Sequence, residues 1–163
     1  MESPEGFLHG LLAALREREV DVEGLRLDHV CYRVATCRRY RELCAELGTE
    51  ATLLGEHAVG GRPIAVWLMH RPWTVGSLSI DVLELPAPKA GSPYPEGFEH
   101  AEFVVGQDLA AFVARHPNAG WDLSGLMKQA NADIRLRLGN GCAKFHRQAL
   151  RDVIAMEHKS PQA

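Results

Sequence analysis

The sequence lacks several features that would point to particular classes of protein. Basic residues are not in excess, since 18 Lys and Arg stand against 21 Asp and Glu in 163 residues, a formal net charge of −3. A nucleic-acid-binding surface requires a basic stripe, so we expect no nucleic-acid partner. The four cysteines form no CxxC pair and no disulfide spacing (Cys31, Cys37, Cys44 and Cys142). We therefore expect reduced thiols in a cytoplasmic protein.

Long hydrophobic runs are also missing. The most apolar early stretch, residues 7–15, is too short to span a bilayer and is interrupted by His9 and Gly10. The positive charge that would precede a secretory signal is absent from the start of the chain. The composition, 46% hydrophobic and 24% charged, is typical of a globular protein, so we expect no membrane partner.

Periodicity predicts the same order of elements in both halves of the chain. An N-terminal helix capped by Ser3 comes first, with leucines at helical spacing. The first half then has a strand over 27–34, a helix that begins after Thr36 and ends at Gly48, and strands over 51–55, 62–70 and 77–85. A Pro- and Gly-rich linker, residues 86–95, follows. The second half has a strand over 99–105, a helix over 108–116, strands over 121–127, 133–138 and 142–146, and a final helix over 148–158, with a hairpin turn at Asn140-Gly141.

The two halves also begin alike. His29 and His100 each follow an acidic residue, and each precedes an aromatic residue by three positions. A chance match of two short strands is the alternative, but we interpret the similarity as an internal duplication of about 70 residues. The predicted fold class is α+β: two pseudo-symmetric βαβββ modules form a half-barrel cup, with an N-terminal and a C-terminal helix. We expect a helical extension over 1–24 and modules over 25–88 and 96–159, packed as one compact domain.

A duplication of this kind brings equivalent positions together on the floor of the cup. His29 and His100 are then expected to face each other, beside Glu84 and His146 from the last strand of each module. Glu84 lies in an otherwise apolar strand, where an unpaired carboxylate is costly to bury. Two imidazoles and a carboxylate with open positions suit Fe(II), Zn(II), Mn(II) or Ni(II). Glu102 shares the face of His100 and competes with Glu84 as the carboxylate ligand.

Two cationic residues share the faces of these histidines. Period-two alternation places Arg33 with His29 and Lys144 with His146. A guanidinium beside a metal would hold a carboxylate or another anion in a two-pronged grip, and we assign Lys144 the same anion-binding role. The acids that precede the two histidines, Asp28 and Glu99, alternate away from this face, so we expect second-shell groups or simple strand-start acids there.

Several segments resemble the YecM family, a bacterial branch of the vicinal-oxygen-chelate superfamily of glyoxalases, bleomycin-resistance proteins and extradiol dioxygenases. The resemblance covers residues 27–157, and the segments that carry it are 28–33, 61–70, 84–86, 94–100 and 144–146. It implies a paired βαβββ fold with a metal site whose ligands come from the first and last strands of each module. The matching positions are His29, Glu84, His100 and His146. In superfamily enzymes the final strand usually carries a carboxylate, where this chain has Lys144-Phe145-His146.

Two functions fit these residues. In the first, a divalent transition metal chelates two vicinal oxygens of a small substrate, Glu102 acts as general base and Arg33 orients a carboxylate, in isomerase, lyase or dioxygenase chemistry. In the second, the same cup binds or sequesters a small molecule without catalysis, with Trp67, Trp73 and Trp121 as candidate lining residues. Either reading allows a monomer or a homodimer.

Overall fold

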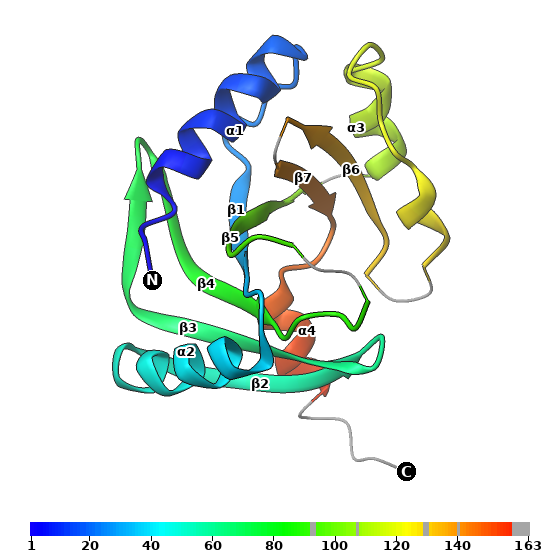
Figure 1. Ribbon diagram of the computed structural model, residues 1–163. Helices are drawn as coiled ribbons and strands as arrows, with labels where there is room; N and C mark the ends of the chain where they lie inside the picture. Colours follow the sequence, from blue (N-terminus) through cyan, green and yellow to red (C-terminus); the bar gives the residue numbers. More distant parts are fainter. Residues whose placement is uncertain (92–93, 107, 129–130, 140, 158–163) are drawn as a thin grey trace.

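Seven strands form one mixed sheet that curls into an open cup (Figure 1). This computed structural model describes residues 1–163 except 92–93, 107, 129–130, 140 and 158–163. The strand order across the sheet is β2-β3-β4-β1-β5-β7-β6. In chain order the elements are α1 (Glu5–Glu17), β1 (Arg26–Arg33), α2 (Cys37–Glu50), β2 (Ala51–Val59), β3 (Arg62–Val75), β4 (Leu78–Pro86), β5 (Gly97–Val104), α3 (Leu109–Arg115), the 3-10 helix η1 (Ser124–Met127), β6 (Asp133–Leu138), β7 (Gly141–His146) and α4 (Leu150–Glu157).

The main hydrophobic core lies on one face of this sheet, under α1, α2 and α3. The predicted leucine stripe of α1 is confirmed, because Leu8, Leu11 and Leu15 are buried. The predicted cap of α2 is confirmed too: Thr36 Oγ1 accepts a hydrogen bond from the Arg39 N–H at 3.1 Å. Among the described residues, no helix is both long and apolar enough to cross a membrane.

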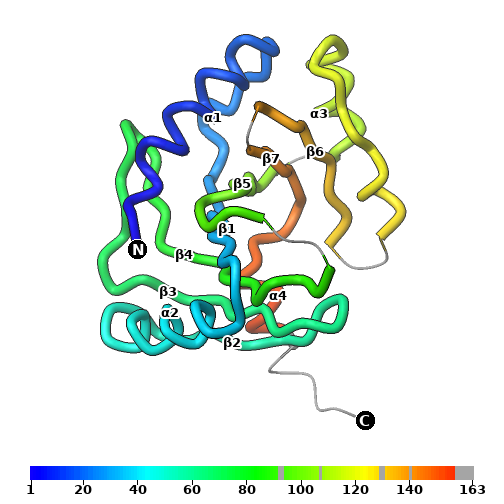
Figure 2. The backbone as a smooth tube through the Cα atoms, viewed as in Figure 1, coloured from blue at the N-terminus to red at the C-terminus, as the bar shows by residue number. Residues whose placement is uncertain are grey.

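The C-terminal helix α4 packs on the other face of the sheet. Ile154 packs there with Val66 of β3 and Val82 of β4 in a second, smaller apolar cluster. Figure 2 shows α4 at the end of the segment that leads from β7, beside the β2–β3 ribbon. The predicted helix began at Gln148, whereas α4 begins at Leu150; its predicted last residue, His158, lies outside the described residues.

The two halves of the cup meet at the centre of the sheet. β1 pairs parallel with β4 in the first half, and β5 pairs parallel with β7 in the second. The antiparallel pairing of β1 with β5 joins the halves, so the two strands that begin the predicted modules lie side by side. The α+β cup predicted from the duplication is therefore confirmed.

One predicted strand in the second half is wrong. Within residues 121–127, Ser124–Met127 form the 3-10 helix η1, and the segment contributes only an isolated bridge between Asp122 and Arg135. Two local features favour the turn over a strand. The Asp122 carboxylate accepts a hydrogen bond from the Ser124 N–H at 3.0 Å, and Gly125 lies so close to β6 that a Cβ there would be 2.5 Å from the carbonyl oxygen of Asp133.

The last hairpin is shifted by one residue from its prediction. Leu138 pairs with Gly141, so Gly141 already belongs to β7. Gly139 has a φ of +55°, which suits glycine in a two-residue hairpin loop. Asn140, on which the prediction also depended, lies outside the described residues.

Candidate metal centre

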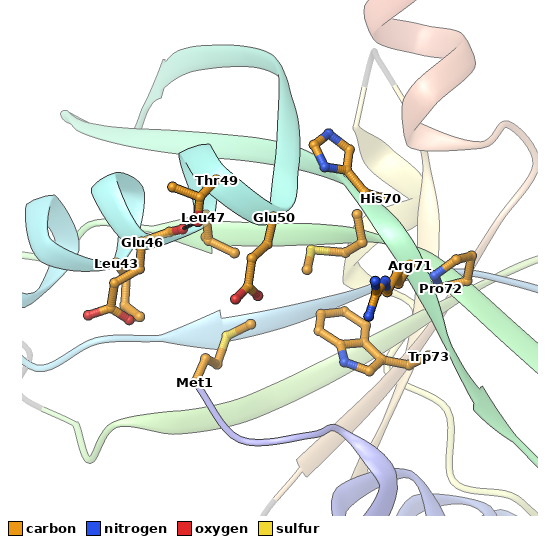
Figure 3. A pocket seen from close by; sticks show the side chains of 11 residues that line it. Met1, Leu43, Glu46, Leu47, Thr49, Glu50, His70, Arg71, Pro72 and Trp73 are labelled. Atoms are coloured by element: carbon orange, nitrogen blue, oxygen red, sulfur yellow. Dashed lines mark hydrogen bonds between the residues drawn. The ribbon is translucent and has the colours of Figure 1, made fainter.

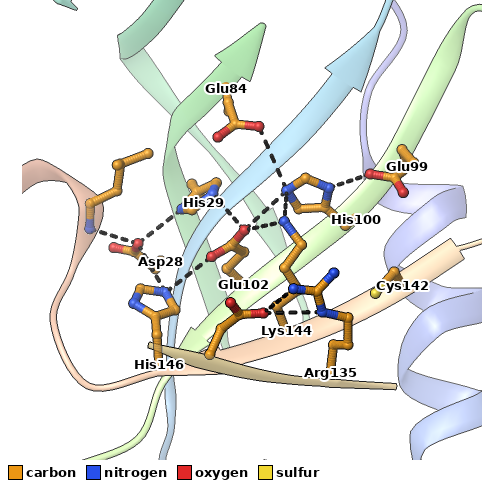
Figure 4. Close-up of polar contacts among 12 residues, drawn as sticks. Asp28, His29, Glu84, Glu99, His100, Glu102, Arg135, Cys142, Lys144 and His146 are labelled. Carbon is orange, nitrogen blue, oxygen red and sulfur yellow. Dashed lines mark hydrogen bonds and ion pairs between the residues drawn. The ribbon is translucent and has the colours of Figure 1, made fainter. Parts of the chain in front are cut away.

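Polar side chains gather where the two halves of the sheet meet, in two adjacent rows across the strands (Figure 4). In one row, Cys31 of β1 lies opposite Glu84 of β4 and His100 of β5. In the next row, Glu102 of β5 lies opposite His29 of β1 and Lys144 of β7. Lys144 in turn lies opposite Arg135 of β6, which the sequence did not single out. Residues directly opposite one another share a face of the sheet, so strand pairing alone brings these groups together.

Two β-bulges turn the acidic residues toward the histidines that follow them. On β1, Leu27 pairs with Phe103 and His29 with Glu102, so Asp28 is an extra residue. On β5, Glu99 is extra in the same way, between the partners of Cys31 and Tyr32. A bulge breaks the period-two alternation, which explains why Asp28 and Glu99 lie beside the histidines instead of facing away.

Each of three imidazoles is held by its Nδ1 atom. His29 Nδ1 lies 2.9 Å from Asp28 Oδ2, and His100 Nδ1 is hydrogen-bonded to Glu99. His146 Nδ1 donates to the carbonyl oxygen of Gln148 at 2.5 Å. Because carboxylates and carbonyls only accept, each Nδ1 carries a proton and each neutral ring has its lone pair on Nε2. Metal-binding histidines are oriented in this way.

All three Nε2 atoms face the carboxylate of Glu102. Its Oε1 lies 3.1 Å from His100 Nε2 and 3.4 Å from His29 Nε2, and its Oε2 lies 3.5 Å from His146 Nε2. Lys144 Nζ donates to Glu102 Oε1 at 2.7 Å and lies 3.0 Å from His100 Nε2. Oε1 of Glu84, the other candidate carboxylate ligand, lies 3.7 Å from His100 Nε2. Glu102 is therefore the centre of the cluster.

The carboxylates of this cluster stabilise the positive charges of their neighbours. Burial would lower the pKa of His29, but Glu102 and Asp28 outweigh burial and raise that pKa to about 10. Burial would raise the pKa of Glu102, yet His29 and Lys144 hold it well below its usual range. The pKa of Lys144 is raised in spite of burial, chiefly by Glu102 and Glu84. These opposite shifts show that each charge is stabilised by its neighbours.

The structure divides the predicted ligands into two overlapping groups. His29, Glu84 and His100 can offer three donor atoms within 4.8 Å of one another, and so can Asp28, His29 and His146. Of the other predicted ligands, His146 is therefore grouped with His29 and not with Glu84 or His100. The residue equivalent to Glu84 in the second half is Lys144, since Glu84 lies opposite Cys31 and Lys144 lies opposite Glu102. The sequence had suggested His146 for that position.

The more exposed side chains mark the accessible side of the cluster. Glu84 and Lys144 are 19% and 20% exposed, whereas His29 and His146 are at most 2% exposed. Arg33 is 32% exposed, and its Nη2 lies 3.1 Å from Glu99 Oε1, which links it to the histidine that Glu99 holds. Glu84, Glu99, Lys144 and Arg33 are thus among the side chains of this region that solvent reaches most.

The candidate aromatic residues lie elsewhere. Trp121 packs against Phe112 and Phe145, and Trp67 is buried in the main core. Trp73 lines a pocket of about 840 Å³ between α2 and β3, together with residues such as Leu43 and Met69 (Figure 3). No residue of the polar cluster lines that pocket.

The model of the family described as YecM protein matches residues 1–136. The chain belongs to the YecM family. It is 28% identical over 176 residues to protein YecM of Escherichia coli strain K12. That alignment covers 94% of this chain and 90% of the Escherichia coli protein. Membership in the YecM family agrees with the resemblance noted from the sequence segments.

Two solved structures have a similar fold. The structural-genomics protein EC4020 has a TM-score of 0.79 at 24% identity and covers 93% of this chain and 87% of its own. A hypothetical protein from Bacillus halodurans has a TM-score of 0.52 at 16% identity and covers 77% of this chain and 96% of its own. These likenesses support the YecM-type fold, while the interpretation of the site depends on its own geometry.

Proposed function

We propose that this protein is a divalent-metal-dependent enzyme of the vicinal-oxygen-chelate type, acting on a small anionic substrate in isomerase, lyase or dioxygenase chemistry. His29, Glu84 and His100 would hold the metal. The observation that supports this most is the shared orientation of two imidazoles: Nδ1 of His29 and of His100 is each held by a carboxylate, and both Nε2 atoms face Glu102 Oε1.

The donor atoms fit a transition metal. His29 Nε2 is buried and has no hydrogen-bond partner among the described residues, so once its proton is displaced its lone pair is directed into the cluster. Two nitrogens and one carboxylate oxygen suit Fe(II), Mn(II), Zn(II) or Ni(II) and leave positions for substrate. When bound, such an ion supplies Lewis-acid stabilisation of a developing oxyanion.

The chain's own residues have distinct roles in this proposal. Glu102 is the general base, because its carboxylate is deprotonated and central in the cluster. Lys144 and Arg33, at the accessible side, bind the anionic part of the substrate. A substrate anion that draws the Lys144 ammonium toward itself withdraws positive charge from Glu102. The pKa of Glu102 then rises, and the carboxylate becomes a better base.

Metal content measured by plasma mass spectrometry, after loading with Zn(II) or Mn(II) and gel filtration, tests the metal site. His100→Ala and Glu84→Gln are each expected to lose one equivalent relative to wild type. His9→Ala, which removes an exposed histidine of α1, should keep the wild-type content. Unchanged content in both site variants would contradict the proposal.

Catalysis requires a separate test. Metal-loaded protein would be screened against small 2-hydroxy and 2-oxo acids and against catechols, with substrate loss followed by mass spectrometry. A turnover that disappears in Glu102→Gln at unchanged metal content supports the role of the base. Turnover that survives this substitution excludes Glu102 from it.

One observation favours a second function, non-catalytic binding of a small anion. Lys144 neutralises Glu102, which weakens Glu102 as a base. Binding without turnover would appear as ligand-induced thermal stabilisation of the metal-free protein, reduced in Lys144→Met.

A further inference from the structure

A second group of metal-ligand side chains lies on the other side of His29 from His100 (Figure 4). Asp28 Oδ2 lies 2.9 Å from His29 Nδ1 and 3.5 Å from His146 Nε2. The side chains of Asp28 and His146 are 0% exposed and that of His29 is 2% exposed. This group is therefore closed to a substrate.

Besides His29 Nε2, two atoms of this group are left without a hydrogen bond. Within the described part of the chain, neither Asp28 Oδ1 nor His146 Nε2 has a hydrogen-bond partner. His146 donates its Nδ1 proton to the Gln148 carbonyl, so the neutral ring presents the Nε2 lone pair to Asp28 and Glu102, each 3.5 Å away. Acceptors that face acceptors in a buried space are costly unless a positive charge lies between them.

Glu102 and His29 each connect this group to the first one. Glu102 has one oxygen near His29 and His100 Nε2 and the other near His146 Nε2. His29 Nε2 faces Glu102, while its Nδ1 faces Asp28. Carboxylates that lie between two positions, with separate ligands on each side, are a feature of two-metal sites.

We propose that Asp28 and His146 bind a second divalent transition-metal ion. It would lie next to the metal of the proposed active site, with His29 between the two positions. Imidazole and carboxylate ligands together favour Zn(II), Mn(II), Fe(II) or Co(II) over Ca(II) or Mg(II). The inference rests on the proposed function for the first ion, but Asp28 and His146 belong only to the second.

The second ion has a structural role, because its ligands secure the start of α4. The Leu150 N–H donates to Asp28 Oδ2 at 2.9 Å, and the Gln148 carbonyl accepts from His146. Both contacts lie at the turn that leads from β7 into α4. An ion that fixes Asp28 and His146 also fixes this turn, and with it the helix that packs on Val66 and Val82.

Titration of the metal-free full chain with Zn(II) or Co(II), in isothermal calorimetry and mass spectrometry under non-denaturing conditions, tests the inference. Wild type is expected to bind two ions, His146→Ala one and His100→Ala one. His146→Gln serves as a second variant of similar size, and circular dichroism checks that each variant folds. Hydrogen exchange of α4 should slow on binding of the ion that His146→Ala loses. A wild type whose only bound ion is kept in His146→Ala, or a folded His146 variant that still binds two, would overturn the inference.

The same variants separate the two proposals. One ion in wild type that is lost in His100→Ala and kept in His146→Ala refutes the second ion and leaves the proposed active site intact. One ion that is lost in His146→Ala and kept in His100→Ala refutes the proposed active-site metal and supports the buried position alone.

Discussion

Glu102 and Lys144 lie directly opposite one another on β5 and β7, and Lys144 Nζ donates to Glu102 Oε1 at 2.7 Å. The same ammonium lies 3.0 Å from His100 Nε2, a proposed ligand atom. Lys144 also occupies the position that corresponds to Glu84 in the other half of the cup. The Lys144 ammonium therefore occupies the position at which the pseudo-symmetry of the fold would place a fourth metal ligand.

Replacing Lys144 should strengthen metal binding. In Lys144→Met, His100 Nε2 and Glu102 no longer share a resident cation, so we expect affinity for Zn(II) or Mn(II) to rise at least about tenfold, or roughly 1.4 kcal/mol. Without metal, the same variant leaves a buried carboxylate without its partner and loses about 3 kcal/mol of stability. Chelator competition and thermal melts measure the two effects. Lys89→Met, an exposed lysine, is the control, and weaker binding in Lys144→Met would contradict this view.

The bulge residue Glu99 should act on the metal through His100. Glu99→Gln replaces the carboxylate that holds His100 Nδ1, which makes the ring less basic and less well oriented. We expect metal affinity to fall by about 10- to 100-fold. Asp81→Asn removes a carboxylate whose partner is Arg151 on α4 and should leave affinity unchanged. Equal affinities in the two variants would refute the role of Glu99.

Metal binding should compete with protons. The pKa of His29 is raised to about 10, so its imidazole is protonated at neutral pH when no metal is bound. A metal at Nε2 must displace that proton, and apparent affinity should therefore increase as the pH rises from 6 to 9. Calorimetry in buffers of different ionisation enthalpy would detect the released proton. An enthalpy that is independent of the buffer would show that no proton leaves.

The irregular segment before β6 should be intolerant of a methyl group. In Gly125→Ala the new Cβ would lie 2.5 Å from the carbonyl oxygen of Asp133, and we expect stability to fall by about 1–3 kcal/mol. Gly48→Ala in α2, where nothing lies within 4 Å, should instead raise stability by about 0.5–1 kcal/mol. Urea denaturation compares the two. Similar midpoints for both variants would mean that Gly125 is not packed against β6.

The fold could be predicted from the sequence because its signals are local and repeated. Helical leucine spacing marked α1, Thr36 marked the start of α2, and the repeated acid-histidine pair marked β1 and β5. The prediction of a strand over 121–127 was wrong, because the turn found there depends on Asp122 and on the contact of Gly125 with β6.

The site was only partly predictable, because the pairing register of its strands cannot be inferred from one sequence. Alternation along an ideal strand identified His29 and His100, and it assigned Asp28 and Glu99 to the wrong face since a bulge leaves no clear signal in one sequence. The match between Lys144 and Glu84 depends on which residues lie opposite one another, and strand pairing is not local information. Arg135 was missed for the same reason.

A crystal structure with bound metal tests the central claim most directly. In crystals grown with Zn(II), we predict an anomalous difference peak about 2.0–2.2 Å from Nε2 of His29, Nε2 of His100 and a carboxylate oxygen of Glu84, with the Lys144 ammonium displaced from His100. Peaks only at exposed histidines such as His9 and His70, with Lys144 still in contact with His100, would contradict the account.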